Sequence, residues 1–227
     1  MTALESEALG LSLRVATWSV VTSLPAGLLV AWLLARREFI GKTALNGLVH
    51  LPLVLPPVVV GYLLLVLLGR NGPLGRWLFE VLGVSLPFTW QGAALAAAVM
   101  AFPLMVRAMR LSLEAVDRRL EAAARTLGAS PMAVFLTVTL PLMAPGILVG
   151  ALLAFARSLG EFGATITFAA NIPGETRTLP LALYGAIQTP GGEAQALRLA
   201  GISVLLSLVA LAASDVVARR LRDRIAR

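Results

Sequence analysis

The sequence has no cysteine and a single histidine, and only 14% of its 227 residues are charged. The lack of cysteine excludes a disulfide framework and a thiolate metal site. The sequence also shows no paired carboxylates, nucleophile triad or metal-ligand cluster, so it predicts neither a catalytic site nor a metal. In contrast, 58% of the residues are hydrophobic and the mean hydropathy is +0.86. A soluble domain of this size has no use for so many apolar runs, which indicates a protein whose solvent is lipid.

Five apolar runs are long enough to cross a bilayer as helices, which takes roughly 20 residues. They occupy residues 15–35, 43–69, 81–106, 132–156 and 199–217. The second run contains Pro52, Pro56 and Pro57, which remove backbone donors and predict a kinked or broken helix. Two shorter runs, 162–170 and 179–188, predict re-entrant segments that enter the bilayer without crossing it. A sixth span formed by these two runs together is the alternative.

The basic residues predict the orientation in the membrane. The formal net charge of +7 invites a nucleic-acid interpretation, but the basic residues flank the apolar runs rather than gather with aromatic residues on a polar face. Residues 36–44, 107–131 and 218–227 hold thirteen of the nineteen Lys and Arg residues, and the opposite side holds six. Because basic loops stay cytoplasmic, we expect the N-terminus outside, the C-terminus in the cytoplasm and no nucleic-acid partner.

A polar segment, residues 112–131, lies between two of the apolar runs. Its apolar residues recur at three- and four-residue steps: Leu113, Val116, Leu120, Ala123 or Ala124, and Leu127. This spacing predicts an amphipathic helix over about 112–128. The i,i+4 pairs Glu114–Arg118 and Glu121–Arg125 would support it by roughly 0.2–0.5 kcal/mol each.

The end of this segment has the residues of a tight turn between two helices. Gly128 can adopt the left-handed conformation of a helix C-cap. Ser130 and Pro131 are typical of the N-cap and first residue of a new helix. We therefore expect a short surface helix, a turn and a helix that enters the membrane. The alternative from composition alone is an ordinary interfacial helix lying on lipid.

The spacing within this segment resembles a known motif. The sequence has Glu121-Ala122-Ala123, then Gly128 seven residues after the glutamate, then Val138-x-Leu140-Pro141. This pattern resembles the EAA loop of binding-protein-dependent ABC transporter permeases, with Val138 where that loop usually has isoleucine. Residues 51–65, LPLVLPPVVVGYLLL, and residues 156–184, ARSLGEFGATITFAANIPGETRTLPLALY, narrow the resemblance to molybdate ABC transporter permeases. It extends from about residue 45 to the C-terminus.

The resemblance implies a fold and a set of partners. Residues 1–227 would form one all-α polytopic membrane domain of the MetI-like permease fold, with about five transmembrane helices, a cytoplasmic coupling helix and short re-entrant segments. The loop 112–131 would dock on cytoplasmic ABC ATPase subunits, which would bind ATP and Mg²⁺, so this chain would be no enzyme and would bind no cofactor. The other implied partners are an extracytoplasmic oxyanion-binding protein, a second copy of this chain and the lipid of the cytoplasmic (inner) membrane. The implied ATPase-coupling residues are Glu121, Ala122, Ala123, Gly128, Leu140 and Pro141.

The resemblance also implies where the translocation path or its gate lies. The residues concerned are Arg157, Ser158, Gly160, Glu161, Phe162 and Gly163. Ionisable groups near membrane depth are costly and indicate function, so Arg157 would ease an oxyanion through the outer part of the path. The alternative is an interfacial ion pair between Arg157 and Glu161, which stand four residues apart.

Gly146 and Gly150 form a Gly-x-x-x-Gly pair, which permits close approach of two helices. The pair would lie either at the seam of a homodimer or in a merely Gly-rich, kinkable helix.

The function predicted from the resemblance is ATP-driven import of molybdate, with tungstate as a related cargo. The same machine carrying sulfate or another oxyanion is the first alternative. A secondary transporter or channel that works without ATP is the second, and an inverted repeat would favour it, but the sequence shows no convincing internal repeat. An inert membrane scaffold, the third, would have no use for proline-broken helices.

Overall fold

The computed structural model describes residues 2–225, and this part of the chain is helical without strands. In chain order the elements are α1 (Ala3–Arg36), α2 (Lys42–Val54), α3 (Pro57–Leu68), α4 (Pro73–Leu82), α5 (Trp90–Glu114), α6 (Arg118–Thr126), α7 (Pro131–Val134), the π-helix η1 (Phe135–Thr139), α8 (Leu140–Leu159), α9 (Gly163–Phe168), α10 (Leu179–Ile187) and α11 (Glu193–Ile225). The predicted all-α class is confirmed.

The long helices agree with the predicted number of membrane spans. Four helical stretches are long and apolar enough to cross a bilayer: α1, α5, the continuous run α7–η1–α8, and the part of α11 over Glu193–Ala213. The pair α2 and α3 gives a fifth if it counts as one span, although it bends by 118° at its junction. Pro56 and Pro57 stand at this junction and have no N–H with which to continue the ladder. The predicted break in the second span is therefore confirmed.

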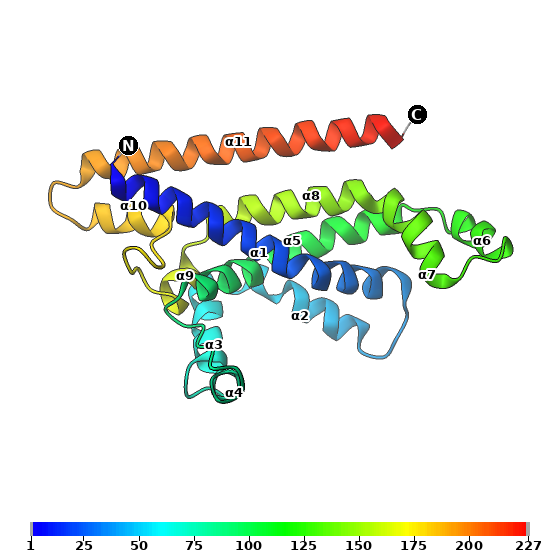
Figure 1. The fold of residues 1–227 in the computed structure, drawn as a ribbon, viewed down its shortest axis with the longest axis horizontal. Coiled ribbons are helices and arrows are strands. Elements are labelled where there is room, and N and C mark those ends of the chain that lie inside the picture. The colour runs from blue at the N-terminus through cyan, green and yellow to red at the C-terminus, as the bar shows by residue number, and fades with distance from the viewer. Residues whose placement is uncertain (1, 226–227) are drawn as a thin grey trace.

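The helix α5 is the centre of the bundle, because it packs against both α1 and α8 (Figure 1). Its buried residues are mostly alanine and methionine: Ala93, Ala94, Ala96, Ala97, Ala98, Met100, Ala101, Met105 and Met109. Small side chains allow helix backbones to approach closely, and methionine fills the irregular gaps that remain. In lipid, where burial of apolar surface gives little gain, this close packing holds the helices together.

Gly146 and Gly150 lie on the face of α8 that contacts α5. A Cβ atom at Gly146 would collide with Cβ of Ser112, and one at Gly150 would stand 3.0 Å from the carbonyl oxygen of Met105. Both glycines are therefore buried against a helix of their own chain. This face of α8 is already covered and is not free to form a seam with a second copy.

The first span begins earlier than the predicted start at residue 15. Thr2 and Glu5 form a capping box at the start of α1, in which each side chain accepts from the other residue's backbone N–H. Glu5 is only 1% exposed, and its Oε1 accepts from Nε of Arg198 on α11 at 2.8 Å. The acidic N-terminus can therefore be helical because a cation from a distant helix neutralises the buried carboxylate.

The predicted third span, residues 81–106, is wrong at both ends. Helix α4 ends at Leu82, and α5 runs over Trp90–Glu114. Between them Gly83 and Phe88 have φ angles of 67° and 63°, values that a right-handed helix cannot contain. The apolar residues between α4 and α5, 83–89, form a loop. Their high hydropathy therefore does not indicate the start of a membrane span.

The two short apolar runs near the C-terminal half form the short helices α9 and α10, which is the arrangement predicted for segments that do not cross. Helix α9 packs against α3, where a Cβ atom at Gly61 would stand 2.6 Å from the carbonyl oxygen of Ala164. Within α9, Ala164, Thr165 and Phe168 are buried. Helix α9 is therefore sheltered by protein, whereas residues 172–174 and 187–191 in the adjoining segments are exposed.

The packing of α8 on α5 gives a test of the fold. Gly146→Val should lower the thermal stability of the detergent-purified protein, because the added side chain collides with Ser112 and overpacking costs about 1–3 kcal/mol. The matched control is Gly201→Val, since Gly201 lies in α11 with nothing within 4 Å of its Cβ position. An equal loss of stability in the two variants, measured by thermal unfolding, would contradict this packing.

Candidate functional site

The polar segment after α5 folds as a short helix, a turn and a new helix. Asp117 caps α6 by accepting from the N–H of Arg119 at 2.9 Å. Gly128 has a φ angle of 85°, in the left-handed region that favours glycine. Ser130 caps α7 by accepting from the N–H of Ala133 at 3.2 Å, with Pro131 in the first turn. The left-handed conformation of Gly128 and the helix start at Ser130 and Pro131 therefore agree with the sequence-based prediction.

The predicted single helix over 112–128 is wrong at its start. Leu113 and Glu114 are the last residues of α5, and α6 begins only at Arg118, because Asp117 takes the extended conformation of an N-cap. Glu114 consequently pairs with Arg110, at 2.7 Å, and not with Arg118. Only the nine residues of α6 form the surface helix.

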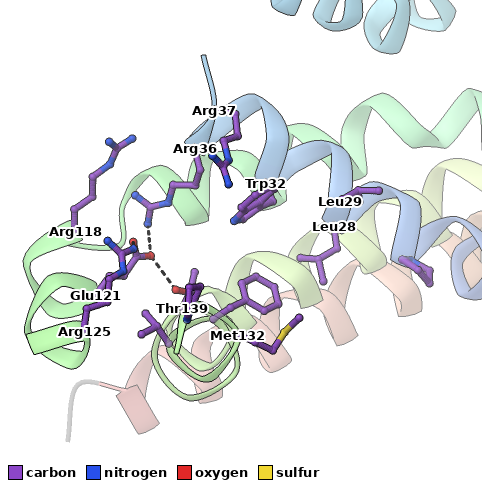
Figure 2. Close-up of a pocket in the computed structure, with 14 residues that line it drawn as sticks. Leu28, Leu29, Trp32, Arg36, Arg37, Arg118, Glu121, Arg125, Met132 and Thr139 are labelled. Atoms are coloured by element: carbon purple, nitrogen blue, oxygen red, sulfur yellow. Dashed lines mark hydrogen bonds and ion pairs between the residues drawn. The ribbon is translucent and has the colours of Figure 1, made fainter. Parts of the chain in front are cut away.

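Glu121 connects α6 to two membrane-spanning segments (Figure 2). Its Oε1 accepts from Nη2 of Arg36, at the end of α1, at 2.9 Å, and from the hydroxyl of Thr139, in η1, at 2.8 Å. Its Oε2 lies 3.8 Å from Arg125. The side chains of Arg36 and Glu121 are only 10% and 11% exposed, so little water competes for the ion pair. Glu121 therefore points into its own chain.

The opposite side of α6 is free and partly apolar. Ala122 and Ala123 are exposed, Leu120 is 50% exposed and Leu127 is 88% exposed. Gly128 beside them has open space at its Cβ position. A cluster of exposed apolar side chains at a polar end of the molecule is typical of a surface that another protein covers.

Leu140 and Pro141 lie at the join between η1 and α8. Leu140 is half-buried and Pro141 is exposed. Proline lacks the N–H that would continue the i→i+4 ladder, and the five-residue π-helix Phe135–Thr139 directly precedes it. Short π-helical turns are frequent at functional sites. Thr139, the hydrogen-bond donor to Glu121, is the last residue of this turn.

The second group of predicted residues lies at the other end of α8, about 30 Å away by the length of a 20-residue helix. Arg157 Nη1 is 2.7 Å from Glu161 Oε2, and Glu161 is 2% exposed. The contact lacks hydrogen-bond geometry, so it holds by charge. The other oxygen of Glu161 accepts from the N–H of Ala164 at 2.8 Å, and the hydroxyl of Ser158 lies 2.8 Å from that of Ser19 on α1.

The remaining residues of this group lie at the join between α8 and α9. Gly160 follows the last residue of α8 and is exposed. Phe162 packs on Tyr184 of α10, with ring centroids 5.0 Å apart. A Cβ atom at Gly163 would lie 2.7 Å from Cβ of Pro57, at the start of α3. The structure therefore brings these residues together where α1, α3, α8, α9 and α10 meet.

Sequence reasoning missed two residues of the loop site, Arg36 and Thr139. Arg36 was recognised only as one of the cationic residues that set orientation, and Thr139 only as part of an apolar run. Arg36 lies 85 residues from Glu121 in the sequence. Since no local pattern joins residues so far apart, only the fold could identify this contact.

Comparison with known proteins agrees with this architecture. Residues 23–223 match the family described as binding-protein-dependent transport system inner membrane component. The chain is 60% identical over 223 residues to the molybdenum transport system permease protein ModB of Escherichia coli (strain K12), covering 98% of this chain and 97% of that protein. It is 57% identical to ModB of Haemophilus influenzae, over 98% and 97% of the two chains. It is 40% identical to the sulfate transport system permease protein CysW of Synechococcus elongatus, over 88% and 70%.

Two solved structures share the fold at low sequence identity. A bacterial ABC transporter involved in the import of alginate superposes with a TM-score of 0.76 at 16% identity, over 97% of this chain and 80% of that one. The MetNI methionine ABC transporter superposes with a TM-score of 0.65 at 18% identity, over 96% and 94%. The family match covers most of the chain, and the predicted permease fold is confirmed. This chain belongs to the inner membrane components of binding-protein-dependent transport systems.

Proposed function

We propose that this chain is the membrane-spanning subunit of an ATP-driven importer of molybdate. The main evidence that the transported ion is molybdate is the sequence identity of 57–60% to two molybdenum permeases, over nearly the full length of both chains. The sulfate permease is less similar, at 40% identity over 70% of its length. Molybdate and sulfate are both tetrahedral dianions, so a permease that passes one could pass the other, and an external binding protein would make most of the choice between them.

The geometry of the loop supports a coupling role. The exposed face of α6, with Ala122, Ala123 and Leu127, is the surface that would dock on a cytoplasmic ATPase subunit. Glu121 on the opposite face ties α6 to α1 through Arg36 and to η1 through Thr139. A force applied to α6 would therefore act on α1 and on the α7–η1–α8 span at the same time. ATP-driven movement of two such loops would rock the spans between inward- and outward-open states.

The residues from Arg157 to Gly163, at the join between α8 and α9, are better suited to a gate than to a tight binding site. Arg157 is neutralised by Glu161 at 2.7 Å, and its side chain is 29% exposed. A cation that is already paired attracts an oxyanion weakly, and a transported ion must leave as well as enter. We place the gate in Arg157, Ser158, Gly160, Glu161, Phe162 and Gly163.

The architecture also supports the proposed orientation. The N-terminus and α10 lie at one end of the bundle, and α6, α7 and the end of α11 lie at the other (Figure 1). Arg36, Arg118, Arg119 and Arg125 gather at the α6 end, which the rule for basic loops makes cytoplasmic. Residues 226–227, at the end of the basic C-terminal stretch used in this prediction, lie outside the described residues.

Reconstitution tests the proposed cargo. We expect proteoliposomes that contain this chain, its ATPase and its binding protein to take up radiolabelled molybdate only when ATP is present inside, and to take up sulfate far more slowly. Tungstate should compete with molybdate. Uptake that is unchanged without the ATPase would contradict the importer proposal, and faster uptake of sulfate would assign the other cargo.

The loop gives a test of coupling. Gly128→Ile should lower the number of ions imported for each ATP hydrolysed, because a β-branched residue at a positive φ costs on the order of 1–3 kcal/mol and the turn would distort. Gly83→Ile is the matched control, since Gly83 also has a positive φ and open space but ends α4. Unchanged coupling in Gly128→Ile protein that is normally inserted would refute the assignment.

Glu121→Lys should also uncouple the complex, because it places two cations together where the ion pair was. Loss of one partner of a poorly hydrated pair costs roughly 3–5 kcal/mol. The exchanged variant, Arg36→Glu with Glu121→Arg, should recover part of the import per ATP. If the exchange recovers nothing while Arg36→Glu alone imports normally, the bridge has no role in coupling.

Cysteine labelling tests the orientation, because the natural chain has no cysteine and single substitutions give a clean signal. Asn71 and Thr126 are both exposed. An impermeant maleimide should label Asn71→Cys protein in intact spheroplasts and Thr126→Cys protein only after permeabilisation. The opposite pattern would invert the topology.

A further inference from the structure

An open cavity of about 1000 Å³ lies between the second half of α1 and the segment α6–α7–η1 (Figure 2). Four arginines line one end of it, Arg36, Arg37, Arg118 and Arg125, and Glu121 is the one acidic residue in the described lining. The rest of the wall is mainly apolar and includes Leu29, Trp32 and Phe135. The cavity is therefore cationic at one end and hydrophobic along its length.

The charges in this cavity do not balance. Glu121 is shared between Arg36 at 2.9 Å and Arg125 at 3.8 Å. Among the residues that the structure describes, Arg37 and Arg118 form no ion pair. Nε of Arg36 is buried and has no hydrogen-bond acceptor. One carboxylate thus faces four guanidinium groups and pairs with two of them, and the chemical group that is lacking is an anionic oxygen acceptor.

The position of the cavity shows where its occupant would come from. Its lining along α1 extends from Arg36 to Pro25, about 16 Å at the helical rise per residue, or half of the roughly 30 Å hydrocarbon core. The guanidinium of Arg37 lies over the ring of Trp32 at 5.1 Å, a pairing suited to the membrane interface. The apolar wall therefore extends from the interface into one leaflet, a region that a soluble partner does not reach.

We propose that this cavity binds one anionic phospholipid from the bilayer. Its phosphate would accept from the exposed guanidinium groups of Arg37 and Arg118, because arginine pairs well with phosphate oxygens. Its acyl chains would lie along Leu29, Trp32 and Phe135. Basic pockets between transmembrane helices at the cytoplasmic side are suited to such headgroups. The bound lipid would lie between α1 and the loop that carries Glu121, whichever ion the complex imports.

Tryptophan quenching in nanodiscs tests this site on the full-length protein without any transport assay. The discs contain phosphatidylcholine and increasing fractions of phosphatidylglycerol with brominated acyl chains, or of brominated phosphatidylcholine at the same fractions. We expect the brominated phosphatidylglycerol to quench more strongly, because the arginines concentrate it beside Trp32. This excess should disappear in the Trp32→Phe variant.

The double variant Arg37→Gln/Arg118→Gln should weaken the apparent affinity for phosphatidylglycerol by roughly 30-fold, from the contribution expected of two basic residues. Arg37 and Arg118 are exposed, so this variant should fold. The matched control is Arg70→Gln/Arg76→Gln, which makes the same change of charge near α4, away from the cavity, and should keep the excess quenching.

Each of the following outcomes would overturn the proposal. The first is equal quenching by the two lipids, or an excess that survives in Trp32→Phe protein. The second is loss of the excess when inorganic phosphate is added, which would indicate a site for a free anion. The third is loss of the excess when the ATPase subunit binds, which would make the cavity part of a protein interface. The fourth is efficient disulfide formation between two copies of Met132→Cys protein, which would show that a second copy fills the cavity.

Discussion

The ion pair between Glu121 and Arg36 is the contact on which the arrangement of the loop depends. It joins segments 85 residues apart, and both side chains are largely withdrawn from water. A carboxylate in this position is costly unless a cation and hydrogen-bond donors satisfy it. Thr139 supplies a further donor. The loop is therefore not a flexible connection between α5 and α8, because its glutamate fixes it to the first span and to the start of α8.

The helices attached to the loop are closely packed, so a movement of the loop can be transmitted to them. Alanines on α5, together with Gly146 and Gly150 on α8, bring the two backbones into direct contact. On the other side of the bundle, Gly61 of α3 packs on the backbone of Ala164. Interfaces made of small residues leave little room for side chains to rearrange, so the helices tend to move as rigid bodies.

The sequence predicted several turns and helix breaks that depend on residues close together in the chain. Gly128, Ser130 and Pro131 gave the turn because cap chemistry acts over a few residues, and the prolines after α2 gave the break in the second span. The start of the first helix was predicted wrongly because a distant residue decides it. Helix α1 starts early because Arg198 neutralises Glu5.

The partner of Glu121 could be found only from the fold.

Hydropathy misassigned residues 81–89, because an apolar loop and the start of a span have the same composition, and only the backbone angles at Gly83 and Phe88 separate them. The predicted coupling and gate residues are brought into two groups by the structure, at the two ends of α8.

The π-helix Phe135–Thr139 has a consequence for how α8 responds to force. Its hydrogen bonds span five residues instead of four, and Pro141 just beyond it withholds a further donor. The helical ladder is therefore weakened next to the point where Thr139 donates to Glu121. A rotation applied there can change the pitch of a single turn, so the segment would act as a hinge between the loop and the span. Pro145 removes one more donor from the ladder that follows.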